Sequence, residues 1–153
     1  MPNIFVQRYF IFGKPTIIDQ IMKKYFYIAD QKQFPYFHGN GPLWLSQGLM
    51  EEDPLINQIA NSGDFVRQKN HIAFSSYMGL DMHPELIEEM ARQLPKGTIV
   101  LVIGFDMDDY PNPTGGQILE VEGGTGRRIQ YQTYPSEWIA RYHFPVLYQE
   151  LSE

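Results

Sequence analysis

NHIAFSSYMGLDMHPELIEEMARQLPKGTIVLVIGFD, from Asn70 to Asp106, is the stretch that decides the fold class of this chain. Its middle part predicts an amphipathic helix, because apolar residues recur there at the spacing of one helix face. These residues are Leu86, Ile87, Met90, Ala91 and Leu94. Pro84 suits the first helical position, where its missing N–H is not needed, and Pro95 with Gly97 ends the pattern.

The run from Thr98 to Phe105 follows this helix directly. In an extended chain its apolar side chains would lie on both faces. A strand of this kind normally lies inside a sheet that is covered on both sides. The segment from His71 to Ser75 predicts the strand that precedes the helix. A strand, helix and strand in one sheet should have their two strands parallel.

Two elements are predicted near the start of the chain and one before the central unit. Asn3 to Phe12 is rich in β-branched and aromatic residues and predicts a strand. Pro15 opens a helix whose apolar residues follow at helical spacing. Asp53, with a proline after it, predicts the start of a second, shorter helix.

The C-terminal part predicts a hairpin and two short segments. Gln117 to Glu122 and Arg127 to Thr133 are strand candidates joined by a glycine-rich turn. Ser136 to Tyr142 predicts one or two helical turns, and the tail HFPVLYQEL predicts a last strand or an extended edge segment.

These elements predict a single α+β domain over residues 1–153, with a mainly antiparallel sheet and two main helices on one face. A ferredoxin-like plan fits this order best. Residues 31–48 would form an inserted, aromatic-rich loop. The second face of the central strand also needs a cover, which the insertion, the tail or a second copy of the chain could supply; a homodimer is therefore one alternative.

Composition excludes several classes of protein. The formal net charge of −6 argues against a large phosphate-binding surface, and there is no cysteine for a disulfide or a thiolate metal site. No apolar run approaches the roughly 18–20 residues of a membrane span, and the N-terminus lacks the pattern of a secretory signal. We therefore expect a cytoplasmic protein without a membrane partner.

Three segments share a pattern with one known family: the opening MPNIFVQRYFIFGKPTIIDQIMKKY, the segment HIAFSSYMGLDMHPELIEEMARQLP, and the acidic strand end with its glycine hairpin, Phe105 to Gly124. They resemble the YubB-like ferredoxin-fold proteins of phages and plasmids. Phe5 and Tyr77 stand near the places where that family is expected to carry tryptophan. The resemblance implies the fold and a mobile-element origin, with the host cytoplasm as location; it implies no catalytic residues.

The insertion is the first candidate binding segment. It carries Tyr36, Phe37, His38 and Trp44, together with prolines and glycines and without a helical or strand period. Long loops inside a domain are often functional, and aromatic side chains suit a protein interface. The alternative is a loop folded over the core with its rings buried. Tyr110, in the turn-rich loop after the central strand, is a further candidate binding residue.

Candidates for chemistry are fewer. None of the four histidines is followed two residues later by Ser or Thr, as a two-histidine phosphoesterase would require. Asp106 and Asp108 at a strand end could hold a hard cation, although a solvated turn is the alternative. Arg127 and Arg128 could bind an anionic ligand, or be ordinary surface charge. No sequence pattern indicates a cofactor.

The sequence therefore favours a non-catalytic intracellular binding protein of a phage or plasmid that sequesters or inhibits a host protein. Nucleic acid is not expected as a partner, because the net charge is negative and the aromatic–glycine motif of RNA readers is absent. The alternative is a small-ligand binder or metal-dependent enzyme that uses Asp106, Asp108, Arg127 and Arg128 at one end of the sheet.

Overall fold

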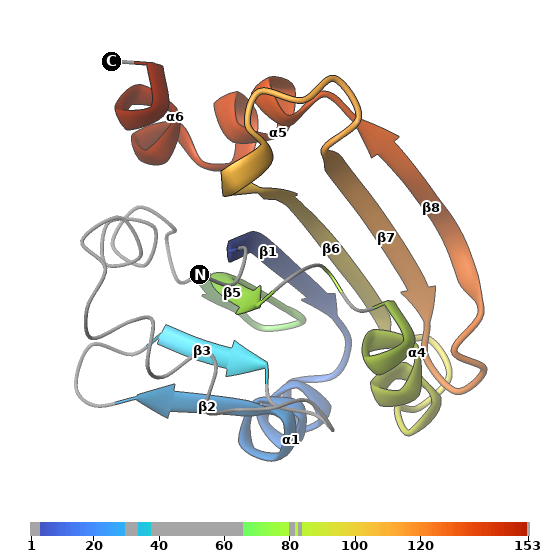
Figure 1. Ribbon diagram of the computed structural model, residues 1–153. Helices are drawn as coiled ribbons and strands as arrows, with labels where there is room; N and C mark the ends of the chain where they lie inside the picture. Colours follow the sequence, from blue (N-terminus) through green and yellow to red (C-terminus); the bar gives the residue numbers. More distant parts are fainter. Residues whose placement is uncertain (1–3, 30–33, 38–65, 80–81, 83, 153) are drawn as a thin grey trace.

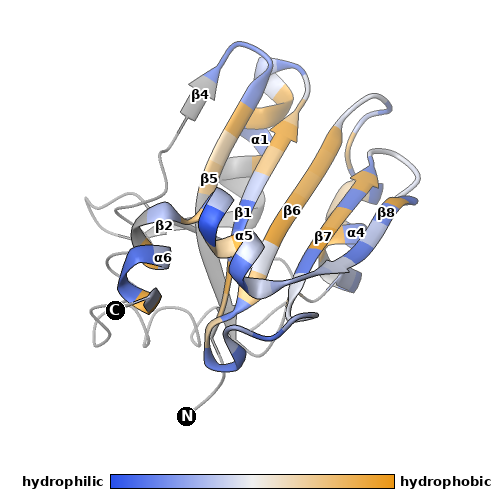
Figure 2. Ribbon diagram, turned by 90° about the horizontal axis from the view of Figure 1, so that it is seen from above, coloured by the Kyte–Doolittle hydropathy of each residue, from blue (hydrophilic) through white to orange (hydrophobic). Residues whose placement is uncertain are grey.

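The computed structural model describes residues 4–29, 34–37, 66–79, 82 and 84–152, and it contains a six-stranded antiparallel sheet in the order β4-β5-β1-β6-β7-β8 (Figure 1 and Figure 2). The strands are β1 (Ile4–Phe12), β4 (Val66–Gln68), β5 (His71–Gly79), β6 (Ile99–Asp106), β7 (Gly116–Glu122) and β8 (Arg128–Tyr134). The helices are α1 (Pro15–Tyr25), α4 (Pro84–Arg92), α5 (Ser136–His143) and α6 (Pro145–Ser152), with a 3₁₀ turn η2 (Met107–Asp109). The chain is thus an α+β protein.

β6 is an interior strand, as its two apolar faces predict. It pairs with β1 on one side and β7 on the other, and both pairings are antiparallel. β5 also runs antiparallel to β1, so β5 and β6 are parallel to each other with β1 between them. The predicted parallel direction of the two strands that flank α4 is therefore confirmed, although the two strands are not neighbours.

The pleat of β1 and β6 divides the core into two clusters, one on each face of the sheet. The first cluster lies under α1 and α4 and consists mainly of Phe5, Tyr9, Ile11, Ile18, Ile21, Ile72, Phe74, Ile87, Met90, Val100, Val102, Leu119 and Val121. The second lies under α5 and α6 and consists of Val6, Ile103, Phe105, Ile118, Ile139, Ala140, Phe144 and Leu147. Burying both faces of β1 and β6 makes these strands the centre of the fold.

The tail was predicted as a strand or an extended segment, and this prediction is wrong. It forms α6, with Pro145 at its first position, where a proline costs no hydrogen bond. Phe144 and Leu147 are both fully buried, three residues apart, so the apolar spacing was that of a helix. The second face of the sheet is therefore covered by the tail, which was one of the three possibilities considered, together with α5.

The hairpin is confirmed. Both ends of β7 and of β8 lie within one residue of the predicted ends. Its turn requires glycine at two places, because Gly124 has a φ of 88° and Gly126 a φ of 68°. β7 and β8 add two strands beyond β6, and α5 and α6 lie on the face opposite α1 and α4. The whole sheet therefore differs from a plain four-stranded plan with helices on one face only.

Little of the predicted insertion lies within the described residues. β3 (Phe34–Phe37) pairs with β2 (Phe26–Ala29) in a small separate sheet, in which Tyr27 lies opposite Tyr36. The rest of the insertion and the helix predicted from Asp53 lie outside the described residues.

Candidate functional site

The two arginines proposed for ligand binding are both engaged in ion pairs within the chain. Arg127 donates to the Glu122 carboxylate at 3.0 Å across the hairpin turn. Arg128 donates to the Glu88 carboxylate on α4, and this hydrogen bond raises the pKa of the Arg128 guanidinium. The Arg128–Glu88 ion pair thus links β8 to α4, and both arginine side chains have a structural role.

The two aspartates lie at the opposite end of the sheet from the arginines. Asp106 ends β6, whereas Arg128 begins β8 beside Val121, close to the start of β6. The Asp106 carboxylate accepts a hydrogen bond of 2.9 Å from the backbone N–H of Asp108 and caps the 3₁₀ turn. The described residues contain no group of three or more potential metal ligands. The alternative of a small-ligand binder or metal-dependent enzyme required the two aspartates and the two arginines at one end of the sheet. The hairpin places them at opposite ends.

The remaining predicted binding residues are aromatic. Tyr110 is half-buried against the second core cluster, with its ring centroid 5.8 Å from that of Phe105. Burial raises the pKa of its hydroxyl, and the nearby Glu137 carboxylate raises it further. Tyr36 and Phe37 belong to β3, but their side chains, like the whole of His38 and Trp44, lie outside the described residues.

A continuous series of rings crosses the face of the sheet on which α5 lies. We call it the ring row; its members are Phe12, His71, Phe10, His143, Trp138, Tyr142 and Tyr134. Consecutive ring centroids are 4.7 Å apart for Phe12 and His71, 6.3 Å for His71 and Phe10, and 6.4 Å for Phe10 and His143. Trp138 continues the row at 6.1 Å from His143 and at 5.3 Å from both Tyr142 and Tyr134.

The strand geometry explains why these rings meet. Phe10 and Phe12 alternate with inward-facing residues of β1, and Phe12 lies directly opposite His71 of β5. Trp138 and Tyr142 are four residues apart on α5 and therefore share one side of that helix. In Figure 2, α5 crosses one end of the strands, and the other end of β5, β1 and β6 has no described element in front of it.

The ring row is both exposed and cationic. Phe12 is 41% exposed, Trp138 40% and Tyr142 62%, although all three are large aromatic side chains. The guanidinium of Arg8 lies 5.4 Å from the Phe10 ring centroid, and that of Arg141 lies 6.0 Å from Tyr142. Burial lowers the pKa of the His143 imidazole, and the positive charge of Arg8 lowers it further. Exposed rings under arginine side chains are typical of a binding surface.

Sequence reasoning missed this surface, although two of its signals were present. The segment FVQRYFIF places aromatic residues on both faces of one strand, so one set had to face away from the helices α1 and α4. In SEWIARYH, Trp138 and Tyr142 repeat at four residues beside the buried pair Ile139 and Ala140. Only the sheet register shows that the two sets adjoin.

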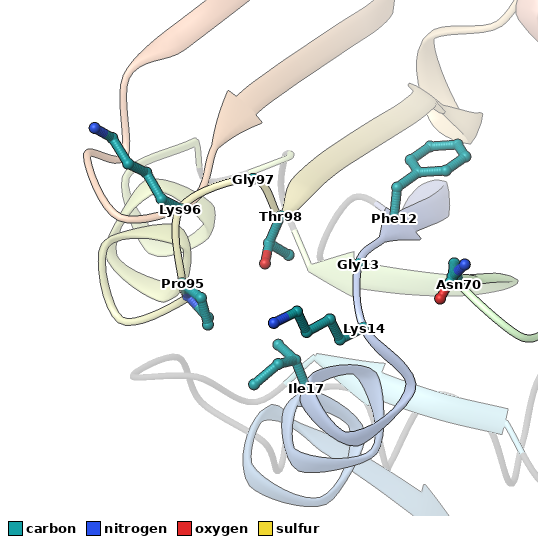
Figure 3. A pocket seen from close by; sticks show the side chains of 9 residues that line it. All are labelled: Phe12, Gly13, Lys14, Ile17, Asn70, Pro95, Lys96, Gly97 and Thr98. Atoms are coloured by element: carbon teal, nitrogen blue, oxygen red, sulfur yellow. The ribbon is translucent and has the colours of Figure 1, made fainter.

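A pocket of about 580 Å³ opens at the end of the sheet where β1 passes into α1 (Figure 3). The loop after α4 forms its opposite wall. Its lining residues are Phe12, Gly13, Lys14, Ile17, Asn70, Pro95, Lys96, Gly97 and Thr98. It touches the ring row only at Phe12, whose ring points away from the other lining side chains in Figure 3. The pocket and the ring row are therefore distinct features.

No protein-family description matches the chain, and neither curated proteins nor solved structures gave a match. Among the described residues, no helix has both the length and the apolar character needed to cross a bilayer.

Proposed function

We propose that this protein is a non-catalytic binding module whose ring row docks a partner protein of the host cell, which it sequesters or inhibits inside that cell. The observation that carries the proposal is the continuity of seven rings from β1 to α5, three of them 40% exposed or more. Large rings give contact area at a low cost in side-chain entropy, and tryptophan, tyrosine and arginine dominate the binding energy of many interfaces.

The charges favour a protein segment that combines apolar and acidic side chains. Arg8 and Arg141 lie over rings of the row, and a carboxylate of the partner could pair with the Arg141 guanidinium at its edge. A long polyanion is less suitable, because the chain carries a net charge of −6 and would repel it. A protein partner needs only a few acidic groups within reach of the row.

The inner part of the sheet supports a relation to ferredoxin-like proteins. The order β4-β5-β1-β6, with α1 after β1 and α4 between β5 and β6, supports the proposal of a ferredoxin-like unit to which β7, β8, α5 and α6 are added. A mobile-element origin rests on the sequence resemblance alone. On this proposal the added elements supply four of the seven rings, because Tyr134, Trp138, Tyr142 and His143 belong to them.

The experiment compares capture of host proteins by the wild type and by three single variants. Trp138→Ala and Tyr142→Ala remove rings of the row. Tyr131→Ala is the matched control, because Tyr131 is also 40% exposed but lies opposite Leu119, on the side of the sheet that faces α4. Any protein captured by the wild type is then purified, and its affinity for all four proteins is measured.

We expect Tyr131→Ala to bind like the wild type and each row variant to lose about 2 kcal/mol, roughly 30-fold in Kd. Equal affinity of the row variants and the wild type would reject the proposal, as would a Kd that is lower for an oligonucleotide than for any protein. Sedimentation of the wild type alone tests whether a second copy of the chain occupies the ring row. If the wild type self-associates and Trp138→Ala does not, the row is the interface of a homodimer instead.

A further inference from the structure

The pocket at the start of α1 carries a positive group where a helix normally carries a polar or acidic one. The Lys14 carbonyl accepts hydrogen bonds of 3.0 Å from the backbone N–H groups of Ile17 and Ile18, so Lys14 is the residue that caps the helix. The first turn of α1 contains no acidic residue. Both the cap position and the positive end of the helix dipole disfavour lysine, and both favour an anion.

A second polar group is directed into the same space. Thr98 is only 3% exposed, and no hydrogen bond of its hydroxyl joins it to the described residues. Figure 3 shows this hydroxyl pointing toward the end of the Lys14 side chain, between Pro95 and Ile17. The hydroxyl can therefore donate to a ligand oxygen that enters the pocket.

The surroundings of the pocket are cationic as well. Lys69, in the turn between β4 and β5, and Lys96 lie at the same end of the sheet as Lys14. None of these three lysines forms an ion pair with a carboxylate in the part of the chain that the structure describes. Local positive charge in a protein with a net charge of −6 would concentrate small anions at this end.

From these features we infer that the pocket binds a small phosphate monoester. The phosphate lies at the start of α1, where it pairs with the Lys14 ammonium and accepts from the Thr98 hydroxyl. The organic group of the ligand lies against Ile17 and Pro95. A volume of about 580 Å³ exceeds the need of a bare phosphate and falls in the usual range for an organic ligand. This site is independent of the proposed docking function.

Isothermal titration with AMP, adenosine, glucose 6-phosphate and inorganic phosphate tests the inference on the full chain. We expect saturable binding of at least one monoester, weaker binding of inorganic phosphate, and none of adenosine. Preference for AMP over glucose 6-phosphate would identify the apolar wall as a base-binding wall, and the reverse would identify a sugar phosphate as the ligand.

Variants then assign the contacts. Lys14→Gln should weaken binding of the preferred monoester about 10-fold or more, as expected for loss of a charged hydrogen bond. Thr98→Val keeps the shape and β-branching of the side chain and should weaken binding about 5- to 10-fold. Lys96→Gln is the matched control, because the Lys96 side chain points away from the cavity in Figure 3; we expect a change within about two-fold.

Three results would overturn the inference. The first is absence of saturable binding by both monoesters at millimolar concentration. The second is equal binding of adenosine and AMP, which would remove the phosphate from the recognition. The third is equal weakening by Lys14→Gln and Lys96→Gln, which would indicate attraction to net charge and not a site. Each titration is accompanied by a thermal melt, so that loss of binding through unfolding is detected directly.

Discussion

Replacing Lys14 by aspartate should stabilise the protein while it removes the proposed phosphate site. Lys14 occupies the cap of α1, and its carbonyl already accepts from Ile17 and Ile18 at 3.0 Å. An aspartate there could accept from a backbone N–H of the first turn, such as that of Thr16, which follows Pro15. Stability and binding should thus change in opposite directions.

The size of the effect follows from two contributions. A good capping side chain is worth about 1 kcal/mol relative to a poor one. Exchange of a positive for a negative charge at the positive end of an 11-residue helix adds about 0.3–1 kcal/mol. The free energy of unfolding should therefore rise by about 1–2 kcal/mol, and Tm by roughly 2–8 °C for a domain of this size.

Urea and thermal unfolding, followed by circular dichroism in a buffer without phosphate or sulfate, measure this change. Lys96→Asp carries the same change in charge on the neighbouring loop without a helix to cap, and it should stay within about 0.5 kcal/mol of the wild type. In 1 M salt the contribution of the dipole should shrink, whereas the cap hydrogen bond should remain.

Two outcomes would refute this reasoning. If Lys14→Asp left the free energy of unfolding unchanged or lowered it, the start of α1 would not be electrostatically unfavourable in the wild type. If Lys96→Asp stabilised the protein equally, the gain would come from general charge and not from the helix cap. In either case the main reason for expecting an anion in the pocket would be removed.

Two further perturbations test other parts of the structure. Glu88→Gln should lower the free energy of unfolding by about 0.5–1 kcal/mol, because the Glu88 side chain is only 13% exposed where it pairs with Arg128. Glu122→Gln, at the more exposed pair with Arg127, should lower it by less than about 0.5 kcal/mol. Equal urea midpoints for the two variants would contradict the link from β8 to α4. Because the folded pKa of His143 is lowered, the folded state binds this proton less readily than the unfolded state, so stability is fully present above the unfolded pKa of about 6.5 and falls as pH drops below it. His143→Gln should therefore lose less stability than the wild type between pH 7.5 and 5.5 in urea titrations, and an equal loss would contradict burial of the neutral imidazole.

Much of the fold could be predicted because it depends on local patterns. The spacing in the α4 segment gave a helix that the structure begins at Pro84, and the two-faced run gave an interior strand, β6. The prediction for the tail was wrong because Phe144 and Leu147, although spaced as in a helix, are too few apolar positions to distinguish a helix from an extended segment. The second face of the sheet decided between them.

The candidate site could be predicted only in fragments. The sequence drew attention to Arg127, Arg128, Asp106 and Asp108, which are close along the chain in pairs, but the hairpin places the pairs at opposite ends of the sheet. It passed over Phe10, Phe12 and Trp138, because a ring beside buried neighbours looks like part of the core. Register determines which rings become exposed neighbours, and register is not a local property of the sequence.

By itself, the sequence determined the helix and strand periods, the glycine turn of the hairpin, and the amphipathic stripes that place α1 and α4 against a sheet. These follow from contacts within a few residues. Only the tertiary structure decided that Phe12 meets His71, that α5 brings Trp138 to the same face, and that Lys14 and Thr98 line one pocket. Each of those meetings joins segments tens of residues apart, and long-range burial of two sheet faces, not local preference, selects them.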